Sequence, residues 1–141
     1  MAYNILIVDD SLPMRGILKK IIRISGFKAG EIFEAANGKD ALDVANRKWC
    51  DIVLTDYNMP VMNGLDFLVE LKKNDLYRDV PVIVVTTEGS QRMIERFMEN
   101  GACGYVKKPF APEAIKEKLN KVMGETADEP GFDESDEGLD F

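Results

Sequence analysis

Short apolar runs alternate along this chain with segments in which apolar residues recur every three or four positions. The runs at 5–8, 52–54 and 82–85 are continuous and rich in β-branched residues, which is typical of strands buried on both faces of a sheet. A weaker pattern at 31–35 alternates as an edge strand does. Together these patterns predict strands at residues 4–9, 31–35, 51–55, 80–85 and 103–106.

The segments between these strands have the period of amphipathic helices. Capping residues, glycines and prolines mark their ends and predict helices at about 11–25, 37–49, 65–71, 90–100 and 112–122. The first helix is expected to bury one face, which carries Leu12, Ile17, Leu18, Ile21 and Ile22. Strict alternation of strand and helix argues for one α/β domain over residues 1–124, with a parallel sheet covered on both sides and right-handed crossovers.

Polar side chains stand where four of the predicted strands end. Asp9 and Asp10 follow the first strand, Asp56 the third, Thr86 the fourth and Lys108 the fifth. Each alone has an ordinary explanation as a helix cap, a turn residue or a solvated charge. In an open parallel sheet, however, ligands bind beyond the carboxyl ends of the strands, where these groups converge. Three carboxylates would repel one another there unless a cation joined them, so the pattern favours metal-assisted carboxylate chemistry.

The charge of the chain is unevenly distributed. All 18 Lys and Arg lie in residues 1–124 with 17 of the 25 acids, whereas residues 125–141 hold eight acids and no base. This composition predicts a disordered acidic tail at 125–141. A second interpretation stays open, because Phe132, Leu139 and Phe141 stand among the acids: the tail docks as a short peptide on a partner or on the lysines of the domain.

Composition also excludes several classes of site and partner. The chain has no histidine, and Cys50 and Cys103 are far apart, so zinc fingers and histidine-based catalytic sites are excluded. A net charge of −7 argues against binding to nucleic acid. No apolar segment is long enough to span a membrane and the first residues lack the features of a signal peptide, so we expect a cytoplasmic protein without membrane contact.

The order and spacing of these motifs resemble a known family over residues 4–123. They are similar to those of receiver domains in two-component response regulators, above all the stand-alone chemotaxis regulators of the CheY type. The resemblance implies a doubly wound, flavodoxin-like (βα)5 fold whose five-stranded parallel sheet has the order 2-1-3-4-5. The residues that carry it are Asp9-Asp10, Asp56, Asn58-Met59-Pro60, Gly64, Thr86 and Lys108-Pro109-Phe110.

The resemblance implies that Asp56 accepts a phosphoryl group from a histidine kinase. An ionised carboxylate needs no general base for this attack, which agrees with the absence of histidine. Mg²⁺ would be the cofactor, an ion that prefers oxygen ligands. Its ligands would be Asp10, the carboxylate of Asp56, the backbone carbonyl of Asn58 and, through a water, Asp9. The protein would be no enzyme in the usual sense, but a phosphoacceptor that promotes its own phosphorylation and dephosphorylation.

The same resemblance implies a switch around the phosphoacceptor. Lys108 would pair with a phosphoryl oxygen, and Lys107 is the second choice for this role. Thr86 would hydrogen-bond the phosphoryl oxygens and shift toward Asp56. Tyr105 would then turn inward into the vacated space, which makes a two-state element biased by added charge.

Further residues are expected to set the lifetime and the output of the signal. Asn58 and Glu88 flank the approach of a hydrolytic water, so we predict that they tune dephosphorylation. Thr87 is bulkier than the alanine or glycine common at its position in the family, so access to the site is expected to be tighter. Output is expected on the face formed by residues 90–123, where a flagellar switch component or a phosphatase would bind a monomer.

Two other functions stay open. A single-domain phosphorelay intermediate in a non-chemotaxis pathway would pass its phosphoryl group on to a histidine protein. A Mg²⁺-dependent phosphatase resembling the haloacid dehalogenase group is disfavoured, because such enzymes need a second acid two residues after the nucleophile. That position is Asn58 here, and Asp9 and Asp10 are adjacent rather than spaced.

Overall fold

The computed structural model describes residues 2–124, and the predicted tail at 125–141 lies outside the described residues. Within that range five strands and five helices alternate, with one 3₁₀ turn, η1, that the pattern did not predict. No helix between residues 2 and 124 has both the length and the apolar character needed to cross a membrane. The elements are β1 (Tyr3–Val8), α1 (Leu12–Ile24), β2 (Ala29–Ala35), α2 (Gly38–Arg47), β3 (Ile52–Thr55), α3 (Gly64–Lys72), η1 (Asp75–Tyr77), β4 (Val82–Thr86), α4 (Gln91–Glu99), β5 (Gly104–Lys107) and α5 (Pro112–Met123).

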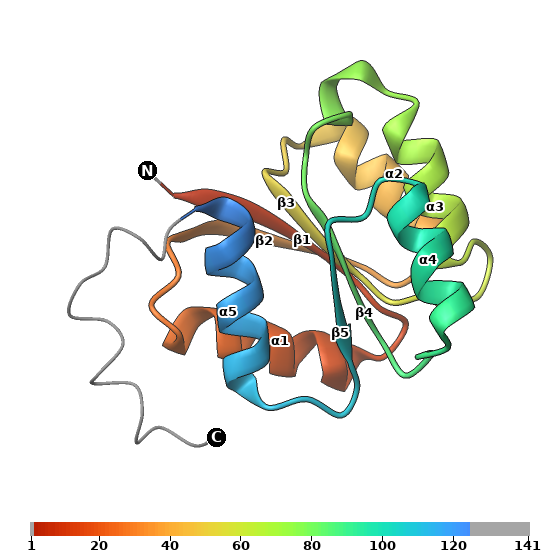
Figure 1. Cartoon of the computed structure of the whole chain (residues 1–141). Coiled ribbons are helices and arrows are strands. Elements are labelled where there is room, and N and C mark those ends of the chain that lie inside the picture. The colour runs from red at the N-terminus through yellow and green to blue at the C-terminus, as the bar shows by residue number, and fades with distance from the viewer. Residues whose placement is uncertain (1, 125–141) are drawn as a thin grey trace.

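The strands form one parallel sheet of order β2-β1-β3-β4-β5, which confirms the predicted fold and strand order. Helices α1 and α5 cover one face, and α2, α3 and α4 cover the other (Figure 1). Because both faces are covered, β3 and β4 are buried along their whole length, which accounts for their continuous apolar runs. The more polar β2 lies at an edge, as its alternation predicted.

Successive strand residues supply two separate apolar layers. Leu6 and Val8 of β1 pack in the layer beneath α2, α3 and α4. Ile5 and Ile7 pack in the layer beneath α1 and α5. Since side chains alternate across a strand, four consecutive apolar residues serve both layers and hold the end of β1 in place.

Side-chain caps begin four of the five helices. Ser11 caps α1, and the other caps are Asn37, Asn63 and Ser90. Each cap satisfies a backbone N–H that the first turn leaves unpaired, so the loops at the carboxyl edge of the sheet turn into helices at defined residues. Helix α5 begins at Pro112 and ends at Gly124, whose φ of 72° is the left-handed conformation that terminates helices.

The predicted buried face of α1 is partly wrong. Leu18, Ile21 and Ile22 are buried, but Leu12 is 67% and Ile17 48% exposed. At 100° per residue, Leu12 and Ile17 lie about 120° and 100° around the helix from Leu18. The face that packs on the sheet is therefore narrower than the set of apolar residues in the segment.

Candidate functional site

Asp9, Asp10 and Asp56 meet at the carboxyl edge of the sheet. Asp9 and Asp10 directly follow β1, and Asp56 follows β3, which is its neighbour in the sheet. One carboxylate oxygen from each residue lies within 4.8 Å of the others. Asp9 and Asp56 are buried, with 1% and 7% exposure, whereas Asp10 is exposed. The structure thus brings together the three acids that the sequence placed at one edge.

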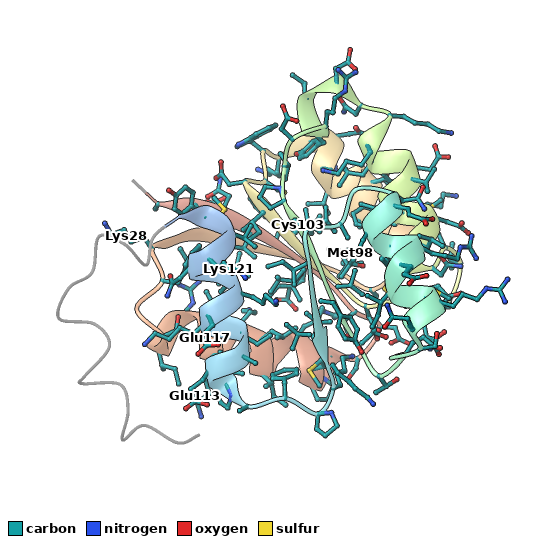
Figure 2. All side chains as sticks on the ribbon, viewed as in Figure 1. Lys28, Met98, Cys103, Glu113, Glu117 and Lys121 are labelled. Atoms are coloured by element: carbon teal, nitrogen blue, oxygen red, sulfur yellow. The ribbon has the colours of Figure 1, made fainter. Side chains whose placement is uncertain are left out.

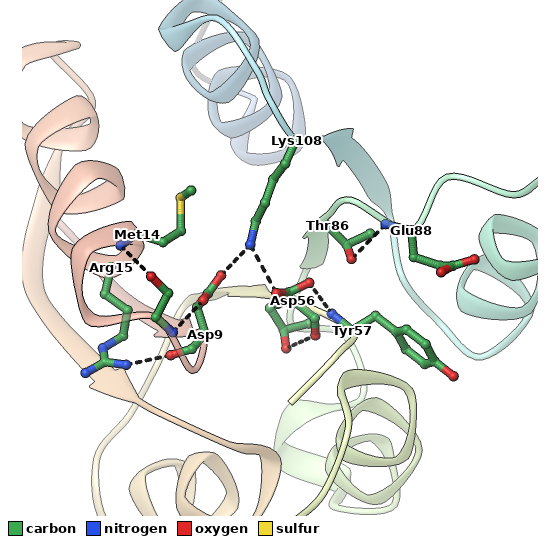
Figure 3. A network of polar contacts seen from close by, with 10 residues as sticks. Asp9, Met14, Arg15, Asp56, Tyr57, Thr86, Glu88 and Lys108 are labelled. Atoms are coloured by element: carbon green, nitrogen blue, oxygen red, sulfur yellow. Dashed lines mark hydrogen bonds and ion pairs between the residues drawn. The ribbon is translucent and has the colours of Figure 1, made fainter. Parts of the chain in front are cut away.

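Lys108 joins the two buried carboxylates (Figure 3). Its Nζ donates to Oδ2 of Asp9 at 2.7 Å and to Oδ2 of Asp56 at 3.0 Å. Burial by itself lowers the pKa of Lys108, but the hydrogen bonds and charges of the two aspartates outweigh it, so the pKa is raised. The neighbouring Lys107 is exposed. Lys108 thus pairs with two of the three clustered carboxylates, which leaves the site with an excess of negative charge.

Backbone amides hold the other oxygens of the buried carboxylates. The N–H of Ser11 donates to Oδ1 of Asp9 at 2.8 Å, and the N–H of Tyr57 donates to Oδ1 of Asp56 at 2.6 Å. Each of these two carboxylates thus accepts a hydrogen bond from a backbone amide at one oxygen and from Lys108 at the other. These bonds fix its orientation before any ligand binds.

Arg15 supports the site from α1, and sequence reasoning missed it. Its guanidinium donates to the backbone carbonyl of Asp9 at 2.5 Å and to Oε1 of Glu34 at 2.9 Å. Glu34 also pairs with Lys19 at 2.9 Å, and the hydrogen bonds from Lys19 and Arg15 hold the pKa of Glu34 below 4.5 despite its partial burial. The sequence feature that could have revealed this role is a basic residue one helical turn after the Ser11 cap.

The loop between β3 and α3 folds closely on itself. The N–H of Gly64 donates to the carbonyl of Tyr57 at 2.9 Å, and a Cβ on Gly64 would lie 1.9 Å from the backbone carbonyl oxygen of Asp56. Only glycine fits there. Val61 has a φ of 70°, which is costly for a β-branched residue. Asn58 lies exposed at the start of the loop.

Thr86 and Tyr105 stand on the neighbouring strands β4 and β5. Thr86 is fully buried, and its hydroxyl accepts a hydrogen bond from the N–H of Glu88 at 3.2 Å (Figure 3). Tyr105 is half-buried, and its hydroxyl oxygen is enclosed without a hydrogen-bond partner among the described residues. A Cβ on Gly89 would lie 2.9 Å from that hydroxyl, so the ring points toward the loop between β4 and α4.

The donor set at this edge fits Mg²⁺. Asp9, Asp10 and Asp56 offer only carboxylate oxygens, and Mg²⁺ prefers oxygen ligands while keeping several waters. The exposed carboxylate of Asp10 leaves one side of the cluster open to solvent, which suits a partly hydrated ion.

Comparisons with known proteins agree with this fold and cluster. Residues 5–120 match the model of the response regulator receiver domain. The chain is 37% identical over 122 residues to a chemotaxis protein CheY homolog of Campylobacter jejuni, with 86% of this chain and 92% of that protein covered. It is 35% identical over 122 residues to chemotaxis protein CheY1 of Helicobacter pylori, with 86% and 97% covered. The crystal structure of CheY4 of Vibrio cholerae is similar at a TM-score of 0.79 and 32% identity, over 86% of this chain and 99% of that one.

A parallel sheet of this order, with acids and a lysine converging beyond its carboxyl ends, defines the receiver class of α/β domain. The chain belongs to the response regulator receiver family. Within that family it is CheY-like, because it matches the chemotaxis proteins over nearly their whole length. Another similar structure is the receiver domain of sensor histidine kinase PA1611 from Pseudomonas aeruginosa, solved with a magnesium ion coordinated in its active site cleft. Its TM-score is 0.77 and its identity 26%, over 88% of this chain and 99% of that one.

Proposed function

We propose that this chain is a phosphorylation-controlled signalling protein of chemotaxis, in which a histidine kinase transfers a phosphoryl group to Asp56. One observation carries the proposal: the buried carboxylate of Asp56 lies 3.0 Å from the ammonium of Lys108, inside a cluster of acids. An aspartate carboxylate can act as a nucleophile and form an aspartyl-phosphate. The same cation lies where the oxygens of a newly added phosphoryl group need compensating charge.

The side chain that attacks and the groups that position it are those described above. An oxygen of Asp56 attacks the phosphorus of a phosphohistidine, and the new O–P bond forms as the P–N bond breaks. The electron pair of that bond returns to the imidazole of the kinase. Lys108 offsets the charge on the phosphoryl oxygens, while the N–H of Tyr57 holds the orientation of the nucleophile. No general base is required.

Mg²⁺ is the proposed cofactor. Asp10, the carboxylate of Asp56 and the backbone carbonyl of Asn58 would hold it directly, and Asp9 would hold it through a water. When bound, the ion would neutralise negative charge on the phosphoryl oxygens. Stabilisation of that charge is the main requirement of a loose transition state. The acid cluster of this chain and the magnesium described for the PA1611 receiver support this assignment.

Thr86 and Tyr105 form the proposed switch. The hydroxyl of Thr86 would exchange its hydrogen bond with the N–H of Glu88 for one to a phosphoryl oxygen. That exchange would draw the loop between β4 and α4 toward Asp56. Since the Tyr105 hydroxyl is already enclosed beside this loop, we expect activation to complete an inward movement of the ring rather than to start it.

The residues beside the site would set how long the signal lasts. Asn58 is exposed and Glu88 half-buried, and their side chains would border the side of the site from which a hydrolytic water comes. We expect Asn58→Ala and Glu88→Ala to change the rate of autodephosphorylation. Thr87 is exposed and would narrow the access to the site.

The proposed partners are a histidine kinase as phosphodonor and an output protein on the face formed by residues 90–123. The chemotaxis relatives favour a flagellar switch component or a phosphatase as the output protein. We propose a monomer, and the net charge of −7 favours a protein that does not bind nucleic acid. The second candidate is a phosphorelay intermediate, which would differ by passing its phosphoryl group to a histidine protein.

The test is phosphorylation of the full chain by acetyl phosphate with Mg²⁺, followed by intact mass and peptide mapping. Wild type should gain one phosphoryl group on Asp56, and Asp56→Asn should gain none. Asp43→Asn, at an exposed position of α2, is the matched control and should behave as wild type. Phosphorylation of Asp56→Asn at the wild-type rate would contradict the proposal. Reappearance of the phosphoryl group on a histidine protein would favour the relay.

A further inference from the structure

A shallow groove of about 440 Å³ lies between β5 and α5. Tyr105, Lys107 and Phe110 line one side, and a stripe of α5 lines the other. The stripe consists of Ala114, Lys118 and Lys121, spaced by four and three residues so that they share one face of the helix. The groove therefore combines apolar surface with several ammonium groups.

The groove carries an excess of positive charge. Lys107, Lys118 and Lys121 line it against a single acid, Glu117, and none of these lysines forms an ion pair within residues 2–124. Figure 2 shows Glu117 and Lys121 on successive turns of α5. Lys19 and Lys73, in contrast, are paired with glutamates. The surface is thus suited to an acidic segment that also carries an aromatic side chain.

Residues 125–141 have the complementary chemistry. They contain eight acids, no base and the apolar residues Phe132, Leu139 and Phe141. They begin directly after Gly124, where α5, one wall of the groove, ends. From Gly124 back to Ala114 the helix spans about 15 Å at 1.5 Å per residue. The eight residues from 125 to 132 can span about 26 Å, so Phe132 can reach the apolar end of the groove.

We propose that residues 125–141 dock in the groove of their own molecule, with Asp128 and Glu129 near Lys118 and Lys121 and with Phe132 at Phe110. A short tether holds a segment at an effective concentration of about millimolar, so weak docking suffices to occupy the groove. Because Tyr105 lines the groove and belongs to the proposed output face, the docked segment competes with the output partner. This consequence rests on the proposed function, whereas the docking itself does not.

The test compares backbone amide chemical shifts of the unphosphorylated full chain by NMR. One variant combines Asp128→Asn with Glu129→Gln, and a second is Phe132→Ala. Both should shift amides at 105–110 and 114–121 relative to wild type, and about 0.5 M NaCl, which screens charges within a few ångströms, should remove most of the difference for the charge variant. Lys121→Glu, at an exposed position, should give the same pattern, and Lys20→Glu on α1 should not.

Unchanged groove amides in both tail variants would overturn the proposal. Shifts that depend on protein concentration would overturn it as well, because they would indicate docking on a second copy. Neither result would affect phosphorylation of Asp56, and failure of that phosphorylation would leave the NMR result standing.

Discussion

The ammonium of Lys108 and the carboxylate of Asp56 are hydrogen-bonded at 3.0 Å although 52 residues separate them in the chain. Lys108 follows β5 and Asp56 follows β3, so the lysine reaches past β4, the strand between them. The same Nζ is bonded to Asp9 beyond β1. One cation thus connects the ends of three strands.

We predict that Lys108→Met destabilises the protein in the absence of divalent ions by about 2–4 kcal/mol, because it leaves Asp9 and Asp56 buried without a cation. Urea unfolding measures the loss, and added Mg²⁺ should restore part of it. Lys107→Met removes an exposed neighbouring charge and should change the free energy of unfolding by less than about 0.5 kcal/mol. Equal stability of the two variants would contradict the bridging role of Lys108.

We predict that Glu34→Gln lowers the free energy of unfolding at pH 7 by about 0.5–1 kcal/mol, a value limited by solvent screening of a partly exposed pair. The pKa of Glu34 is lowered from 4.5 in the folded protein. Its contribution is therefore fully present above pH 4.5 and is lost as the pH falls through the folded-state pKa. The free energies of unfolding of wild type and variant should accordingly converge as the pH falls through the folded-state pKa of Glu34.

The matched control for this pH dependence is Glu31→Gln on the same strand. Glu31 is exposed and has no ion pair in the described part of the chain. We expect this substitution to leave the acid limb of the stability profile unchanged. A gap between wild type and Glu34→Gln that persists once the pH is below the folded-state pKa of Glu34 would rule out the ion pairs as its cause.

We predict that Gly64→Ala destabilises the protein by more than about 2 kcal/mol and slows phosphorylation by acetyl phosphate at least ~10-fold. The added methyl would overlap the carbonyl oxygen of Asp56, so the backbone that carries Asp56 and Asn58 has to move. Gly16→Ala is the control, because nothing lies within 4 Å of that position on α1. It should stabilise the protein by about 0.5–1 kcal/mol without changing the rate. Similar effects of both substitutions would contradict the close approach.

The acids of the site were predictable because their placement is local. Asp9 and Asp56 each follow a continuous β-branched run, and the parallel sheet brings the ends of such runs to one edge. The helix caps were predictable for the same reason, since Ser11 and Asn37 directly precede the periodic segments. The strand-end position of each acid and the position of each helix cap can be read from the residues next to it in the sequence.

Other features depend on distant parts of the chain and were not predictable. The approach of Gly64 to the Asp56 carbonyl depends on the path of the whole loop, and so does the left-handed backbone of Val61. The support that Arg15 gives to Asp9 requires Glu34, which a different strand contributes. The exposure of Ile17 depends on which face of α1 meets the sheet, and composition does not reveal that face.

Two buried tyrosine hydroxyls differ in their hydrogen-bond partners. Substitution of each tyrosine by phenylalanine is therefore predicted to change the stability of the protein differently. The Tyr77 hydroxyl contacts the carbonyls of Ala45 and Lys48 at 2.9 and 3.0 Å and accepts a bond from the N–H of Cys50 at 3.3 Å. Tyr77→Phe should therefore cost about 1–3 kcal/mol with or without an activating ligand. The Tyr105 hydroxyl has no partner among the described residues.

Tyr105→Phe should leave the metal-free protein equally stable or stabilise it by up to about 1 kcal/mol, because it removes an unsatisfied buried hydroxyl. If Tyr105 completes its inward movement on activation, its hydroxyl gains a partner, and the variant then loses stability relative to wild type once beryllofluoride and Mg²⁺ are added. Thermal and urea unfolding with and without the mimic measure this difference. A Tyr105→Phe effect that is the same in both conditions would show that the hydroxyl does not change partners, and the switch would have to work through the ring alone.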